Sequence, residues 1–481
     1  MTETDKNKKR WPWWGRLLLL LSPIFVLLLV IVVFEAGGRR SFNKALQDAR
    51  DIGGPVTFEE IEAARKVVPD DVNGALIITS LTGPLSPSTD NPAHELLPLL
   101  GQADLPPLGE KWPDQTDQVV RDYLARLSAE LSKIDGLARC ESGGMPFQVA
   151  PNPFDTLLPS LGHVRESCKL KSLQVISEAM QGNTKSLVTD LDILLRHGQT
   201  LADHPTLISS LVHVATDSLA LDVLQRVLGQ TTVSAEQLRQ IEPLVRAVED
   251  EDRLYWGIRG ERAMLVGAVT WMTASGARGI PGAASLPLPA NIPGVRGWVM
   301  GDMAEGLRLE NRLVKAKGPR ERIKAATEVE TAVVRLPRYR VLSRTLIPSM
   351  KRAFSLDLHV TAMARSTRAA LAAECYRLDK GRFPDKLEEL VPGYLDAVPT
   401  DPFDDKPLRY RVDPDGVVIY SIAEDRNDGG GQVQGRMPPK SRPLDVGFVL
   451  LKPDSRGRPA SSTAPATQEA EATAVSTGSA R

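Results

Sequence analysis

The sequence contains little cysteine. The three cysteines, Cys140, Cys168 and Cys375, form no C-x-x-C pair and follow no regular spacing, which excludes zinc-ribbon and thioredoxin-like sites. In an oxidising compartment Cys140 and Cys168 can form a disulfide if the helices that carry them are neighbours, but three cysteines do not build a disulfide framework. The alternative is that they are small, buried apolar side chains.

The chain also has no large excess of positive or negative charge and few aromatic residues. Lys and Arg number 59 and Asp and Glu number 60, so the chain has no overall field to attract a nucleic acid, and we expect no nucleic-acid partner. Aromatic residues make up 5% of the chain. Because Leu, Ala and Val are abundant instead, the composition favours helices packed through aliphatic stripes. A chain of 481 residues is long enough for two or three domains.

Familiar catalytic motifs are absent from the sequence. It has no G-x-S-x-G, no P-loop and no dinucleotide-binding glycine pattern, and its six histidines form no H-E-x-x-H. The acidic run from Glu249 to Asp252, followed by Arg253, is typical of charges at a helix start. These absences favour a non-enzymatic protein. The alternative is an envelope hydrolase of unrecognised type, with its active groups in the helical region.

The longest apolar run lies near the N-terminus. From Leu17 to Phe34 the chain carries no charge and is interrupted only by Ser22 and Pro23, and roughly 18 residues are nearly enough for a helix to cross the hydrocarbon core. Three tryptophans precede the run, where aromatic rings anchor at the headgroup level. We predict an uncleaved transmembrane helix over 17–36. A cleaved signal peptide, cut near the small residues Ala36 to Gly38, is the alternative.

Basic residues flank this run on both sides. Five lysines or arginines precede it and four follow it closely, a slight excess that places the N-terminus in the cytoplasm. We therefore predict a single-pass protein of the cytoplasmic (inner) membrane, with membrane lipid as a partner and the bulk of the chain outside the cytoplasm. The predicted segments are a basic and aromatic flank (1–16), the membrane helix (17–36), a linker (37–55), a helical domain (56–350), a small α+β module (353–452) and a disordered tail (453–481).

The middle of the chain has the pattern of consecutive helices. Thr57 with Glu60 reads as a capping box, and a long amphipathic helix is predicted from Gln115 to Leu137. Breaks follow at Gly182-Asn183, at Gly198 and His204-Pro205, at Gly229 to Ser234 and at Glu249 to Asp252. We expect a mainly α fold, an irregular helical bundle or a solenoid-like stack.

The sequence pattern of the last part of the chain predicts a helix followed by strands. A helix from Phe354 to Arg382 presents one apolar face and ends at Gly381. Two segments in which apolar and polar residues alternate lie on either side of Asp413 to Gly416, and this pattern predicts a β-hairpin. A third strand is expected at Val446 to Leu451. Beyond it the chain has almost no large apolar residues, which is typical of a disordered tail.

Several motifs of this module occur in a characteristic order: Tyr-x-x-Asp-x-Gly-x-Phe-Pro from Tyr376, Leu-x-x-Leu-Val-Pro from Leu387, Asp401-Pro-Phe, and a hairpin that ends in Tyr420-Ser. Residues 354–451 resemble the head of G-type major pseudopilins of bacterial type II secretion systems. The resemblance implies an extracytoplasmic module that contacts other envelope or secretion proteins. A genuine pseudopilin also has a processing site, and here Gly15 is followed by Arg-Leu-Leu without the usual Glu.

The resemblance also implies a calcium site in the loop after the hairpin. The segment from Ser421 to Gly429 keeps Ser421 and Asp425 of the family pattern but lacks its glycines. Asp425 and Asp428, with the carbonyl of Ile422, are the candidate ligands, since calcium prefers several oxygen donors. The alternative is a solvated acidic turn. A second acidic turn, formed by Asp401, Asp404 and Asp405, is predicted to be solvated.

Overall fold

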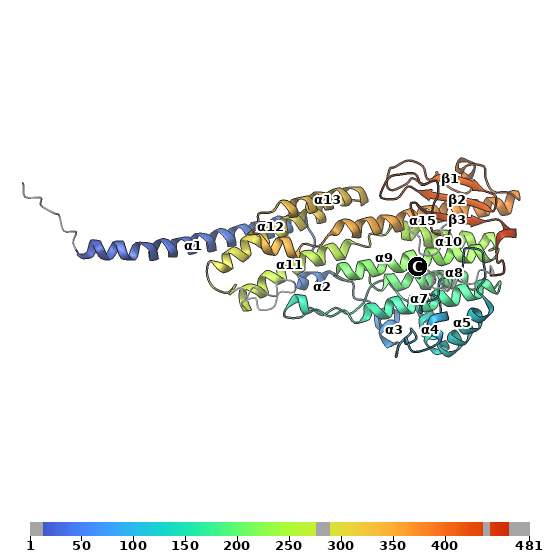
Figure 1. Ribbon diagram of the computed structural model, residues 1–481, viewed down its shortest axis with the longest axis horizontal. Coiled ribbons are helices and arrows are strands. Elements are labelled where there is room, and N and C mark those ends of the chain that lie inside the picture. Colours follow the sequence, from blue (N-terminus) through green and yellow to red (C-terminus); the bar gives the residue numbers. More distant parts are fainter. Residues whose placement is uncertain (1–12, 276–288, 436–442, 461–481) are drawn as a thin grey trace, which may run out of the picture.

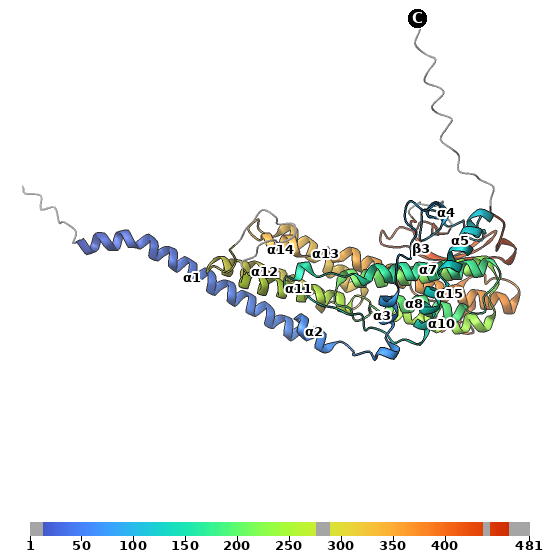
Figure 2. The same cartoon turned by 90° about the horizontal axis from the view of Figure 1, so that it is seen from below.

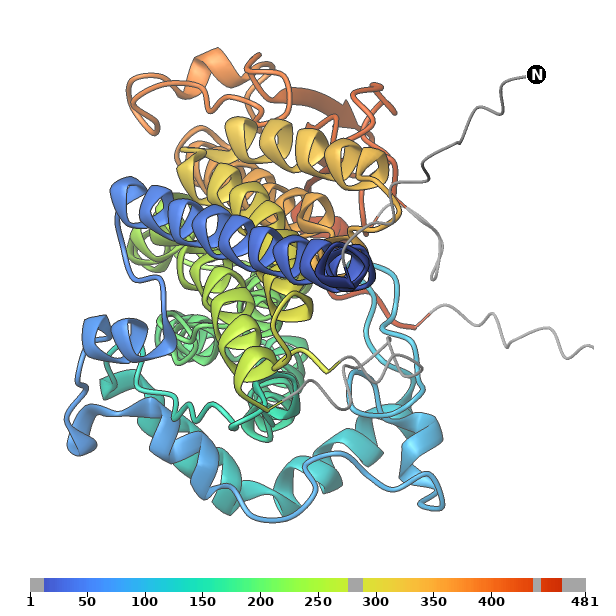
Figure 3. The same ribbon diagram turned by 90° about the vertical axis from the view of Figure 1, so that its left-hand side faces the viewer.

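The computed structural model describes residues 13–275, 289–435 and 443–460. The molecule is elongated and mainly helical, with the N-terminal helix α1 (Trp13–Ile52) projecting from one end and a small sheet at the other. The first part of α1 projects beyond the helical body, and its second part lies across one end of that body (Figures 1, 2 and 3). The mainly α fold with a small antiparallel sheet is confirmed.

Helix α1 contains the predicted membrane segment and continues well beyond it. The part of α1 from Leu20 onward is long and apolar enough to cross a membrane, and its most apolar stretch is not buried in the protein. The linker predicted for 37–55 is wrong, because the same helix runs without a break to Ile52. Of the predicted flank 1–16, residues 1–12 lie outside the described residues.

The physical reason for this continuation is a second apolar stripe on α1. Phe42, Ala45 and Ala49 recur at helical spacing and are buried, so this part of the helix packs on the body, whereas the preceding turns are exposed. Their neighbours in the cluster include Met303 and Leu307. The basic residues of this segment are exposed and do not interrupt the stripe.

Short helices and loops follow α1 and cover one side of the body. Thr57 caps α2 as predicted, since its hydroxyl accepts the amide hydrogen of Glu60 while the Glu60 carboxylate accepts that of Val56. The helix predicted from Gln115 to Leu137 is divided at Leu127, where the backbone leaves the helical conformation. The helices of this part are α2 (Phe58–Ala64), α3 (Gly74–Ser80), α4 (Ala93–Leu96), α5 (Asp114–Arg126) and α6 (Ser128–Asp135).

The central bundle consists of long helices whose breaks coincide with those read from the sequence. Its largest apolar cluster contains residues from α7 to α10, from α15 and from the sheet. Two helices, α11 and α12, form a second cluster with α1. The bounds are α7 (Ser160–Met180), α8 (Leu187–Gln199), α9 (Leu207–Gln230), α10 (Ala235–Asp250), α11 (Tyr255–Ser275), α12 (Val295–Lys315), α13 (Pro319–Arg335), α14 (Val341–Leu346) and α15 (Met350–Lys380).

The C-terminal module has the predicted elements. Helix α15 ends at Gly381 in the left-handed conformation (φ 76°). Three antiparallel strands follow in the order β1-β2-β3: β1 (Arg409–Asp413), β2 (Gly416–Ser421) and β3 (Val446–Leu451). One face of the sheet packs on α15, and on the predicted apolar face of that helix Leu371 is buried whereas Leu378 is 36% exposed.

The module shares its core with the helical body. Buried residues of α15, β2 and β3 belong to the same apolar cluster as those of α7 to α10, and the Gln225 side chain of α9 accepts the amide hydrogen of Val449 on the edge strand β3 (2.7 Å). The first residues of the predicted tail are also ordered: Arg456 pairs with the buried Glu374 (2.8 Å). Residues 461–481 lie outside the described residues.

The three cysteines are unpaired and buried. Burial raises the pKa of the Cys168 thiol to about 12. The structure thus shows the alternative to a disulfide: Cys140, Cys168 and Cys375 are small apolar side chains in the interior.

Candidate functional site

The junction of α1 with α12 fixes the apolar helix to the body. The two helices cross so closely that a Cβ atom at Gly38 would overlap the carbonyl oxygen of Gly297, and a Cβ atom at Gly297 would overlap the backbone of Glu35. Gly37 has open space around it. Glycine at the contact positions therefore permits a backbone approach that larger residues would prevent.

A carboxylate of α1 caps the start of α12. Glu35 accepts hydrogen bonds from the Gly294 amide (3.2 Å), from Arg296 (2.6 Å) and from Arg39 (2.8 Å). A negative charge at a helix N-terminus is stabilised by the unpaired amide groups and the helix dipole. Glu35 lies directly after the exposed apolar segment, so this cap connects that segment to the body.

Polar contacts continue along the two helices toward the C-terminal end of α1. Arg308 donates to Ser41 Oγ (2.8 Å), and Asn311 donates to the carbonyl of Ala45 (3.1 Å). The fully buried Arg262 of α11 donates to the carbonyls of Ala49 (3.3 Å) and Pro55 (2.7 Å). A cation at this end of α1 satisfies its last carbonyls.

A buried carboxyl group lies beside these contacts. Glu310 of α12 is fully buried, and neither of its side-chain oxygens has a hydrogen-bond partner among the described residues. Burial and the nearby Glu261 raise the pKa of Glu310 to about 8, against the opposing effect of Arg262. Burial also lowers the pKa of Arg262 to about 10. Glu310 is therefore a neutral acid in the folded protein below about pH 8.

A groove of about 680 Å³ lies at the same junction. Val33 and Phe34 of the apolar segment line one part of it, and Trp298, Tyr339 and Arg340 line another. Aromatic and cationic side chains next to an apolar span are typical of the headgroup level of a bilayer. The groove marks where the exposed apolar surface of α1 meets the polar body.

The predicted calcium ligands lie in the loop after β2. Asp425 accepts the amide hydrogen of Asn427 (3.0 Å), and Asp428 accepts hydrogen bonds from Tyr420 (3.0 Å) and Gly430 (2.8 Å). The amide of Ile422 donates to a different carboxylate, that of Asp401. Asp425 and Asp428 thus make local bonds within the turn, and calcium binding by Ile422, Asp425 and Asp428 stays a prediction.

The acidic turn predicted to be solvated is partly buried. Asp401 is fully buried and pairs with Arg409 (2.5 Å) while its oxygens accept hydrogen bonds from Ser421 and Phe403. Asp404 pairs with the same arginine (2.5 Å). The prediction is wrong for Asp401 because this carboxylate holds the turn against the end of β2.

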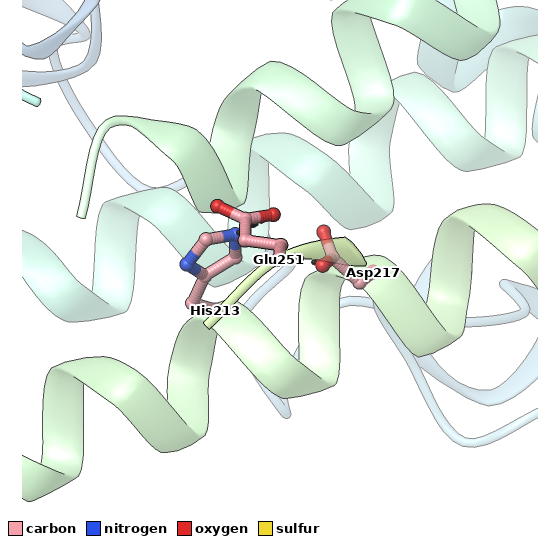
Figure 4. Close-up of side chains that lie close together, drawn as sticks. All are labelled: His213, Asp217 and Glu251. Atoms are coloured by element: carbon pink, nitrogen blue, oxygen red, sulfur yellow. Dashed lines mark ion pairs between the residues drawn. The ribbon is translucent and has the colours of Figure 1, made fainter. Parts of the chain in front are cut away.

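A second charged cluster is buried between α9 and the connection from α10 to α11. His213 and Asp217 occupy successive turns of α9, and Glu251 follows the end of α10 (Figure 4). The Nε2 atom of His213 lies 3.6 Å from Asp217 Oδ2 and 3.5 Å from Glu251 Oε2. Arg253 donates to Asp217 (2.5 Å) and to Asp357 of α15 (3.1 Å).

The two carboxylates determine the protonation of His213. Burial acts to lower the pKa of His213, but Glu251 and Asp217 outweigh it and raise this pKa. Burial opposes ionisation of Glu251 as well, yet His213 and Arg253 lower its pKa. Burial raises the pKa of Asp217 against the effect of both cations. The two carboxylates therefore favour the protonated, positively charged form of the His213 imidazole over its neutral form.

This cluster was not recognised from the sequence. The charges from Glu249 to Arg253 were assigned to a helix start, whereas they lie at the end of α10 and in the connection to α11, and Arg253 is 2% exposed. The available signal was the spacing of His213 and Asp217, four residues apart in an apolar helix. A charged pair on one face of such a helix needs partners elsewhere in the chain.

Comparison with protein-family models, with curated proteins and with solved structures finds no match for this chain.

Proposed function

We propose that this chain is a single-pass protein of the cytoplasmic membrane whose rigid helical body carries a pseudopilin-like module on the extracytoplasmic side, where the module contacts other envelope or secretion proteins. In this proposal the N-terminus is cytoplasmic and α1 binds membrane lipid. The protein acts through binding and position, without an enzymatic reaction.

The observation that carries the proposal is the continuity of α1. The exposed apolar segment and the buried stripe belong to one 40-residue helix, and the stripe is part of the body's own core. A flexible linker would leave the body free to reorient, whereas a continuous helix fixes it relative to the membrane. The groove with Trp298, Tyr339 and Arg340 has the composition expected where such a helix leaves the bilayer.

The position of the sheet supports a contact role for the module. The sheet lies at the end of the molecule opposite the projecting helix (Figure 1). Strand β1 is at the sheet edge, and Val412 within it is 58% exposed. An edge strand offers backbone groups and alternating side chains to an extended segment of a partner. The sequence resemblance to pseudopilin heads covers this part of the chain.

The burial of the His213 cluster supports the non-enzymatic part of the proposal. His213 and Asp217 are each 1% exposed, and Arg253 fills the space beside them with hydrogen bonds to Asp217 and Asp357. A macromolecular substrate needs direct access to catalytic side chains. His213 and Asp217 are enclosed by the helices around them, and Glu251 is 24% exposed.

Site-specific photo-crosslinking tests the contact role. A photoreactive residue placed at Val412 should give discrete crosslinked products with one or a few envelope proteins in native cells. The same photoreactive residue at Leu157, which is 83% exposed and lies in the loop before α7, is the matched control and should give none of these products. Identical products from both positions, or products from neither, would contradict the proposal.

Two further measurements address the alternatives. Turnover of ester, peptide or glycoside substrates by the purified protein, in excess of a mock preparation, would favour the hydrolase. Mass analysis of the N-terminal peptide decides whether the chain is cut after Gly15, as a genuine pseudopilin would be. The proposal expects an intact N-terminus.

A further inference from the structure

The His213 cluster has the geometry of a metal site. The Nε2 atom of His213 has no hydrogen-bond partner among the described residues, although the side chain is 1% exposed. It points toward Asp217 and Glu251, and one ligand atom from each of the three residues lies within 4.8 Å of the others. An unpaired polar atom in the interior is costly, so such an atom needs a partner.

The distances fit shared ligands better than hydrogen bonds. Separations of 3.5 and 3.6 Å from the imidazole nitrogen to the two carboxylates are long for an N–H···O bond. Two ligands held about 2.1 Å from a tetrahedral ion lie roughly 3.4 Å apart. The two distances from His213 Nε2, to Asp217 and to Glu251, are thus those expected between ligands of a four-coordinate ion.

The charges of the cluster also call for a divalent cation. Asp217, Glu251 and Asp357 face one guanidinium, that of Arg253, which leaves two negative charges uncompensated when His213 is neutral. The neighbouring Arg322 is matched by Asp252 (2.5 Å). A proton on His213 would remove one of the two charges, whereas one divalent ion balances both. Uncompensated buried charge is strongly unfavourable.

We propose that His213, Asp217 and Glu251 bind one divalent transition-metal ion, with water as the fourth ligand. One nitrogen and two carboxylate oxygens are a donor set that suits zinc. The ion would join α9 to the connection between α10 and α11, and Arg253 would hold the Asp217 carboxylate in place through its hydrogen bond to Oδ2. Its role is structural: it stiffens the body that the proposed function requires, but it can bind whether or not that function is correct.

Zinc itself is the probe for the first test. Full-length protein in detergent is stripped with a chelator, supplied with Zn²⁺ and desalted, and the bound metal and the melting temperature are measured. We expect one zinc ion per chain and a higher melting temperature. His213→Gln and Glu251→Gln should each lose the zinc and the shift, while His163→Gln, a histidine outside the cluster, should keep both. Zinc bound equally by His213→Gln, or no zinc in the unsubstituted protein, would overturn the proposal.

Cobalt provides a test that needs no variant. If the substituted proteins do not fold, Co²⁺ added to the stripped, unsubstituted protein should give the visible absorption of a four-coordinate ion, and zinc should abolish it. Absence of this band would show that the cluster is a buried ion pair in which a protonated His213 bridges two carboxylates.

Discussion

Replacing Glu310 with Gln should remove a large pH-dependent penalty on stability. The carboxyl group is fully buried and has no hydrogen-bond partner in the part of the chain that the structure describes, and its pKa rises from the ordinary 4.5 to about 8. Below pH 4.5 both the folded and the unfolded protein carry the proton, so the group has no penalty there. As the pH rises toward 8, only the unfolded state releases the proton, and the folded state becomes relatively less stable.

The size of the effect follows from the two pKa values. Each unit of difference corresponds to about 1.4 kcal/mol, so the penalty is roughly 3 kcal/mol at pH 7 and about 4 kcal/mol at pH 8. Between pH 5 and pH 8 the free energy of unfolding of the Glu310→Gln variant should therefore rise by about 3 kcal/mol relative to that of the unsubstituted protein. Gln has nearly the same shape as the neutral acid, so the two proteins should have similar stability at pH 5.

Denaturant unfolding of the full-length protein in detergent at several pH values measures this difference. The matched control is Glu305→Gln on the same helix, whose side chain is partly exposed; it should follow the unsubstituted protein at each pH. A difference between Glu310→Gln and the unsubstituted protein that is constant from pH 5 to pH 8 would refute the reasoning.

Three other changes test separate parts of the structure. Gly38→Val should lower stability by roughly 1–3 kcal/mol because it separates α1 from α12, while Gly37→Val, with open space around it, should not; equal melting temperatures would contradict the crossing. Leu371→Asp buries a charge in the shared core and should cost at least roughly 3 kcal/mol in a single transition; loss of the sheet signal alone, at a separate lower temperature, would indicate an independent module. Calcium at a hundredfold excess over its dissociation constant should stabilise the protein by about 2.7 kcal/mol, and Asp425→Ala should abolish this shift; a melting curve that is the same in chelator and calcium would eliminate the loop as a site.

Local signals in the sequence predicted much of the helical fold. Gly381 ended α15 as expected because glycine adopts the left-handed conformation without strain. The turn signal from Asp413 to Gly416 located the hairpin, in which Asp413 pairs with Gly416. In each case the information lies within a few residues of the feature, so a sequence pattern is sufficient.

Long-range contacts were not predictable in the same way. Gly38 was assigned to the predicted linker 37–55, but it meets Gly297, about 260 residues away in the chain. The charges of Glu251 and Arg253 were assigned to a helix start because their buried partners, His213 and Asp357, lie in other helices. Only the packing of the helices brings these residues together.

The central claim is that α1 anchors the chain while the body and its sheet stay on the extracytoplasmic side. A cysteine placed at the exposed Asp454, near the sheet, can be labelled with a membrane-impermeant maleimide in intact spheroplasts. The three native cysteines are buried, so the unsubstituted protein gives the background. We expect full labelling of Asp454→Cys before lysis. Labelling that appears only after lysis would place the body in the cytoplasm and contradict the account.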